Sequence, residues 1–212
     1  MQTDDLIAAL SGDLAPAPRG MVGRKLATGL FIGMAATFLV LLFTLRLRPD
    51  LGTAVYGAAF WLKFAYTFAL AGLGLWLVER QARAGANVTA PGWLLLAPVL
   101  LLTSVAAMQI SAPEADWRSL TMGHTARVCS LLIVALSFPI FAGVFWAMRA
   151  LAPTRLTLAG ACAGLLAGAA SATLYGLHCP EVAAPFILVW YSLGIILATG
   201  LGAIAGRWAL RW

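Results

Sequence analysis

The chain has 212 residues, of which 62% are hydrophobic and only 10% are charged, and its mean hydropathy is +0.91. Soluble domains carry about 45–50% apolar and about 25% charged residues. The composition therefore predicts an integral membrane protein and excludes a soluble enzyme, a secreted disulfide scaffold and a disordered tail protein. The net charge of +6 comes with no basic run longer than Arg24-Lys25, which is typical of residues that flank membrane spans and not of direct nucleic-acid binding.

Residues 1–25 form a polar tail that precedes the first apolar stretch. Thr3 is a candidate helix cap, and two aspartates follow it in the first turn, where negative charge suits the helix dipole. Apolar residues then recur at helical spacing, which predicts a short amphipathic helix that gains stability by docking into a partner's groove. The alternative is a leader that is disordered or docks on its own chain. The residues of this candidate protein-binding segment are Asp4, Asp5, Leu6, Ile7, Leu10 and Leu14.

Residues 26–212 predict an all-α, six-helix transmembrane bundle. Each apolar stretch is long enough to span a bilayer, which takes about 20 residues of helix. The stretches are continuous, whereas strands of a transmembrane barrel are shorter and alternate in polarity. The expected spans are about 26–45, 54–78, 92–110, 128–148, 157–177 and 185–206.

The distribution of basic residues predicts the orientation. With the N-terminus in the cytoplasm, nine Lys and Arg lie on the cytoplasmic side and four lie outside. The positive-inside rule then places both termini in the cytoplasm. Within the bundle, Gly160, Gly164 and Gly168 are spaced four apart, which predicts close packing of the fifth span against a neighbouring helix.

Lys63 is the one ionisable residue well inside an expected span. Ionisable residues inside the membrane are candidates for function. No Asp or Glu lies in another expected span to pair with it. We therefore favour a lysine that extends outward past Tyr56 toward the interface over a transport residue.

Cys129 and Cys179 are both expected at the outer side, which is an oxidising compartment. Cys162 is expected near the opposite side, as a small buried apolar residue. His124 and His178 accompany the outer cysteines, so the four side chains are a candidate site for a soft or borderline metal ion. A metal-reactive or redox-active thiol pair, a static disulfide and unpaired cysteines all stay open, and no obligatory cofactor is indicated.

The sequence contains no catalytic triad, phosphate-binding loop or chain of cysteines that would pass electrons onward, so we do not expect an enzyme. Two other functions remain as alternatives. A small six-span transporter or exporter would use Lys63 and the glycine-rich fifth span. A membrane thiol oxidoreductase would cycle the outer cysteines with a quinone.

The chain resembles the NrsF family of bacterial membrane-bound anti-sigma factors along essentially its whole length. Three groups of residues carry this resemblance: the tail, an outer cysteine, and a second outer cysteine within a Leu-His-Cys-Pro-Glu loop. They are Thr3 to Leu10 followed by Pro16, Pro18 and Arg19; Cys129; and Leu177-His178-Cys179-Pro180-Glu181 with Pro185-Phe186 and Trp190-Tyr191.

The resemblance implies a six-span protein of the bacterial inner membrane whose cytoplasmic tail holds an extracytoplasmic-function (ECF) sigma factor. It also implies that Cys129 and Cys179 sense stress, heavy metals included. The tail then corresponds to the sigma-binding element, with Leu6, Ile7, Leu10 and Leu14 as its anchors. The partners implied are the sigma factor and the lipid bilayer.

Overall fold

The computed structural model describes residue 3 and residues 20–82, 92–113, 115–151 and 153–211. These residues form helices and no strand. The predicted amphipathic helix, with Asp4, Asp5, Leu6, Ile7, Leu10 and Leu14, lies outside the described residues.

Six helical segments are long and apolar enough to cross a membrane, which confirms the predicted fold class. Their described helices begin and end within five residues of the predicted limits. In chain order they are α2 (Met21–Thr44), α4 (Ala58–Gln81), η1 (Trp93–Leu95) with α6 (Leu96–Ile110), α8 (Ala126–Arg149), α9 (Leu156–Tyr175), and α10 (Ala184–Phe186) with η2 (Ile187–Tyr191) and α11 (Ser192–Ala209).

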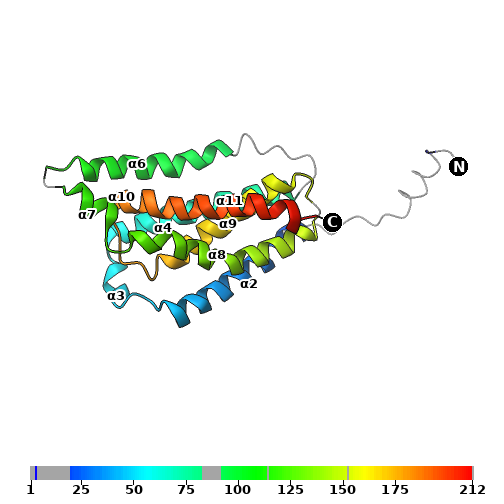
Figure 1. Ribbon diagram of the computed structural model, residues 1–212, viewed down its shortest axis with the longest axis horizontal. Coiled ribbons are helices and arrows are strands. Elements are labelled where there is room, and N and C mark those ends of the chain that lie inside the picture. The colour runs from blue at the N-terminus through cyan, green and yellow to red at the C-terminus, as the bar shows by residue number, and fades with distance from the viewer. Residues whose placement is uncertain (1–2, 4–19, 83–91, 114, 152, 212) are drawn as a thin grey trace.

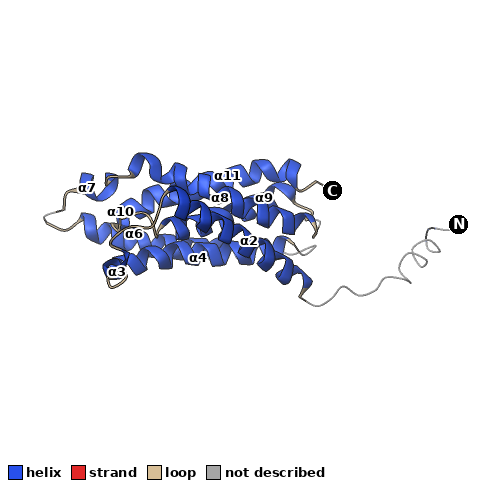
Figure 2. Cartoon of the chain, turned by 90° about the horizontal axis from the view of Figure 1, so that it is seen from below, coloured by secondary structure: helices blue, strands red, loops and turns tan. Residues whose placement is uncertain are grey.

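The two ends of the bundle differ in what they carry (Figure 1). The short helices α3 (Leu51–Ala54) and α7 (Trp117–Met122) lie with α10 at one end, which we call the loop end. The C-terminus lies at the opposite end, which we call the terminal end, and the view from below shows the same arrangement (Figure 2). The loops at residues 45–57, 111–125 and 176–183 therefore share the loop end.

The bundle surface explains why these segments are helices. Large apolar side chains such as Phe43, Phe68 and Leu100 are more than half exposed on the outside of the bundle. In lipid no water is present to satisfy backbone N–H and C=O groups, so a spanning segment must pair them internally, as a helix does. The exposed apolar side chains thus form a surface that is suited to contact with lipid.

Helix α9 is the centre of the bundle, and glycines bring α11 against it. A Cβ at Gly160 would lie 2.8 Å from the Cα of Gly206, and a Cβ at Gly164 would lie 2.8 Å from the Cα of Thr199. At Gly168 the same atom would lie 2.8 Å from Ala198 Cβ. The glycine spacing therefore makes the close helix contact that the sequence predicts, because each glycine faces atoms of α11 with no room for a side chain.

The buried side chains form two clusters, one toward each end. The cluster at the loop end contains Cys129 and Cys179, together with Tyr175 and Tyr191. Cys162 belongs to the other cluster. The predicted separation of Cys162 from the other two cysteines is therefore present in the fold.

Candidate functional site

The loop at residues 176–183, which we call the thiol loop, begins as a continuation of α9. The backbone N–H groups of His178 and Cys179 both donate to the carbonyl of Tyr175, at 2.9 and 3.0 Å. This extra turn carries Cys179 back over the end of the bundle. The side chain of Cys179 has no exposed surface there.

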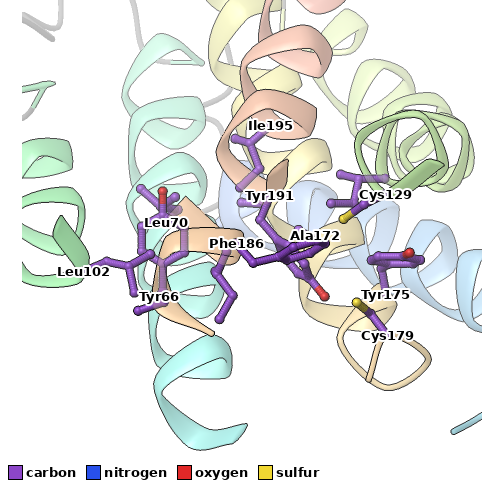
Figure 3. Close-up of a cluster of buried hydrophobic side chains, with 14 of the residues drawn as sticks. Tyr66, Leu70, Leu102, Cys129, Ala172, Tyr175, Cys179, Phe186, Tyr191 and Ile195 are labelled. Carbon is purple, nitrogen blue, oxygen red and sulfur yellow. The ribbon is translucent and has the colours of Figure 1, made fainter. Parts of the chain in front are cut away.

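Cys129 approaches the same place from the first turn of α8. Its backbone N–H donates to the Thr125 carbonyl at 3.0 Å, and the Thr125 hydroxyl lies 3.8 Å from the sulfur of Cys179. The sulfur atoms of Cys129 and Cys179 point toward the same space in Figure 3, and the two thiols lie close enough to interact. Both are free thiols in the structure.

The electrostatic surroundings favour the ionised form of Cys179. The pKa of its thiol is lowered because the Cys129 thiol hydrogen-bonds to it, and the Lys63 ammonium acts in the same direction, whereas burial opposes the shift. The thiolate is the form of cysteine that attacks oxidants and binds soft metals. The pair therefore combines a reactive sulfur with a neighbouring second thiol.

Two tyrosines line this space, one from each helix that flanks the thiol loop. Tyr175 and Tyr191 have no exposed surface, and their ring centroids are 5.8 Å apart. Tyr191 ends η2, a five-residue π-helix, and π-helices are rare and frequent at functional sites. Within η2, the carbonyl of Trp190 accepts a 2.7 Å hydrogen bond from the Ser130 hydroxyl of α8.

The expectation that Lys63 extends outward is wrong. Its side chain is 1% exposed, and Nζ donates to the backbone carbonyls of Cys179 at 2.9 Å and Glu181 at 3.1 Å. The thiol loop provides acceptors within the bundle, so the ammonium has no need to reach the interface. Lys63 was the main support for the transporter alternative. This contact removes that support, because the Lys63 ammonium binds the backbone of the thiol loop.

The predicted set of two cysteines and two histidines does not assemble as a metal site. No group of three or more His, Cys, Asp or Glu in the described part of the chain could hold a metal ion. The ring Nδ1 of His178 pairs with the carbonyl of Arg46 at 2.8 Å, and His124 is exposed. The His178 ring thus binds the backbone before α3 and not the thiols, and the soft ligands that remain together are the two sulfurs.

Glu181 and Arg48 also hold the thiol loop, and the sequence reasoning did not single them out as site residues. The Glu181 carboxylate accepts a 2.7 Å hydrogen bond from the backbone N–H of His124. The backbone N–H of Arg48 donates to the carbonyl of Leu177 at 3.1 Å. The position of Glu181, two residues after Cys179, was the available signal for its part in the site.

The guanidinium of Arg48 is fixed by Asp50. Its Nε and Nη2 atoms donate to the two carboxylate oxygens at 2.7 and 2.6 Å. This bidentate pair raises the pKa of Arg48 and lowers the pKa of Asp50, chiefly through the hydrogen bonds between them. The loop between α2 and α3 thereby presents a rigid edge to the thiol loop.

The arrangement thus encloses the two thiols beneath a loop that is held by the backbone of Arg48, by Lys63 of α4 and by the backbone of His124. It offers two sulfurs that can form a disulfide or supply two soft ligands. The cysteines themselves belong to α8 and to the loop that continues α9.

Comparison with known proteins agrees with this architecture. The family model described as "NrsF: Negative regulator of sigma F" matches residues 10–212. The chain is 41% identical over 215 residues to the anti-sigma-F factor NrsF of Caulobacter vibrioides (strain NA1000 / CB15N), with 100% of both chains covered. It is 40% identical over 213 residues to the probable anti-sigma-F factor NrsF of Azospira oryzae, again with 100% of both chains covered.

No solved structure matches the chain significantly. The family model covers nearly the whole chain, and both relatives align with it from end to end. The chain therefore belongs to the NrsF family, the negative regulators of sigma F.

Proposed function

We propose that this protein is a membrane-bound anti-sigma factor that holds an ECF sigma factor and releases it when Cys129 and Cys179 react with a heavy metal or an oxidant. The juxtaposition of the two buried thiols is the observation that carries the sensing part. The end-to-end similarity to proteins named anti-sigma-F factors supports the regulatory part and a non-catalytic role.

The protein lies in the bacterial inner membrane with both termini in the cytoplasm. Nine Lys and Arg then lie on the cytoplasmic side and four lie outside, as the positive-inside rule requires. This orientation directs the loop end, with the thiol pair, to the periplasm. The stimulus acts on one side of the membrane and the sigma factor is held on the other.

The sigma factor is held by the tail of residues 1–25. Its apolar stripe docks into a groove of the sigma factor, and its aspartates face basic residues of that partner. The residues assigned to this contact are Asp4, Asp5, Leu6, Ile7, Leu10 and Leu14. The sigma factor, and not this protein, contacts nucleic acid.

The helices around the thiols provide a route for the signal. Cys129 belongs to α8, the thiol loop continues α9, and Tyr191 leads into α11. The glycine contacts between α9 and α11 run along the bundle toward the terminal end. A disulfide or a bound metal at the sulfurs changes how these helices pack. The helices have two discrete arrangements, and the change favours the arrangement in which the tail releases the sigma factor.

The test replaces each cysteine with serine and measures transcription from a sigma-dependent promoter, with and without cadmium or a peroxide. Cys129→Ser and Cys179→Ser are expected to abolish induction, whereas the control Cys162→Ser responds like the wild type. Deletion of residues 2–15 is expected to give full transcription without any stimulus. Normal induction in both outer cysteine variants would contradict the sensing role, and normal repression after the deletion would contradict the role of the tail.

A further inference from the structure

Lys63 takes no direct part in the proposed reaction of the cysteines, yet its side chain reaches the thiol loop that carries Cys179. It lies in the second turn of α4, and its Nζ reaches the backbone carbonyls on both sides of Pro180, those of Cys179 and Glu181. The rings of Phe60 and Tyr191 lie 5.9 Å from the same nitrogen. The ammonium is therefore enclosed by two carbonyl oxygens and two aromatic faces.

A buried ammonium needs acceptors, because removal of its hydration shell is costly. Lys63 forms no ion pair with another of the described residues. The thiol loop supplies the carbonyl acceptors instead. The attachment is mutual: the loop satisfies the charge of Lys63, and Lys63 holds the loop against α4.

We propose that Lys63 is a positioning residue that keeps the thiol loop closed over the cysteines, and that movement of the Cys179 backbone on reaction breaks this attachment. The proposal rests on the proposed function for its link to signalling, although the closed loop itself is independent of the sigma factor. Once its carbonyl acceptors move away, the ammonium is left buried without them. The outer part of α4 must then shift to give Lys63 new partners.

Helix α4 carries such a shift toward the terminal end. Its buried residues continue from Lys63 through Thr67 and Leu70 to Val78. Toward the terminal end of α4, a Cβ at Gly74 would lie 3.0 Å from the backbone of Leu166 in α9. With no flexible side chain between the two helices at this point, α4 and α9 move together.

The experiment measures how fast each cysteine of the full-length protein in membranes is alkylated by N-ethylmaleimide, using mass spectrometry of the digested chain. Lys63→Met keeps an unbranched side chain as far as Cε and removes the ammonium, and Lys63→Arg keeps the charge. Thr67→Val is the matched control, since Thr67 is buried one turn away and its hydroxyl bonds to α4 carbonyls alone. Cys162 reports on the integrity of the fold in every sample.

We expect Lys63→Met to speed alkylation of Cys179 by about tenfold, because opening of the loop controls access to a buried group. Cys162 should react at the wild-type rate in this variant, Thr67→Val should behave like the wild type, and Lys63→Arg should restore most of the protection. An unchanged rate at Cys179 in Lys63→Met would overturn the proposal. Equal acceleration at Cys179 and Cys162 would also overturn it, because Lys63 would then support the whole fold and not the loop.

Sigma-dependent transcription in the same variants separates this proposal from the proposed function. Lys63→Met is expected to raise uninduced transcription, with the variant present in membranes at wild-type amounts. Faster alkylation with unchanged transcription would retain the closed loop and contradict its link to signalling. Slow alkylation together with loss of induction in the cysteine variants would overturn the role of Lys63 and leave the sensing function in place.

Discussion

The carboxylate of Glu181 accepts a hydrogen bond of 2.7 Å from the backbone N–H of His124, which joins the thiol loop to the turn that precedes α8. Gly123 makes this contact possible. Its φ is 47°, and a Cβ there would lie 2.6 Å from the Glu181 carboxyl carbon. The two cysteines sit on the two segments that this hydrogen bond connects, so the bond contributes to their juxtaposition.

Removal of the Glu181 carboxylate should loosen this junction. We expect Glu181→Ala to lower the stability of the purified protein by about 1 kcal/mol, a typical net value for one hydrogen bond. Glu181→Gln keeps an acceptor oxygen and should lose less. Thermal melting in detergent, followed by fluorescence, measures both variants. Equal losses in the two would show that the contact with His124 does not contribute.

The seam between α9 and α11 should tolerate no side chain. Gly164→Val would force apart two backbones, and overpacking of this kind costs about 1–3 kcal/mol. Gly200→Val is the matched control, because it makes the same change in α11 where no atom lies within 4 Å of the added Cβ. Melting of the detergent-solubilised variants is the measurement. Similar melting temperatures for the two would contradict the close contact.

The Arg48–Asp50 pair predicts a specific pH dependence. Because the folded state lowers the pKa of Asp50, its contribution is present above the ordinary pKa of a carboxyl group and is lost as the pH falls through the lowered value. The melting temperatures of wild type and Asp50→Asn should therefore differ by a constant amount from about pH 5 to 8 and converge below about pH 4. The difference should stay within about 3 °C, since the Asp50 side chain is more than half exposed and solvent screens its charge. A difference that persists undiminished at low pH would argue against this pair as its source.

The orientation predicts which introduced cysteines react from outside. Ser119 in α7 and Thr154 before α9 are exposed at opposite ends of the bundle. An impermeant maleimide added to intact spheroplasts should label Ser119→Cys and spare Thr154→Cys, and lysis should expose the second site. The wild-type chain serves as the blank, because Cys129 and Cys179 have no exposed surface and Cys162 is 6% exposed. The reverse labelling pattern would invert the proposed topology.

The sequence was sufficient to predict the six spans. In lipid a spanning segment must pair its own backbone groups, as a helix does, so a continuous apolar run of sufficient length indicates a helix. The spacing of Gly160, Gly164 and Gly168 predicted a close helix contact, but it did not predict that α11 is the partner helix. Sidedness predicted that Cys129 and Cys179 lie at the same end of the bundle and left open whether they pair. These features depend on local composition and on which end of a span a residue occupies.

The surroundings of the thiols were not predictable in the same way. Lys63 has no acidic partner in another span, and its actual acceptors are backbone carbonyls, which no residue type reveals. The π-helix that ends at Tyr191 lies within a run that reads as ordinary helix. His178 adjoins Cys179 in sequence, but its ring pairs with the backbone of Arg46, and the side chain of His124 is exposed. Each of these depends on long-range packing.

The complete burial of Cys129 and Cys179 has a kinetic consequence. In the proposed orientation, a chemical in the periplasm meets a closed protein surface, so a productive collision must wait for a fluctuation of the protein. Where reclosure is fast, the delay before a response is set by how often that fluctuation occurs and by whether the chemical can enter a dry space. Under the proposed sensing function, the protein then discriminates among chemicals first by which of them can reach the buried thiols, and only afterwards by how they react with sulfur.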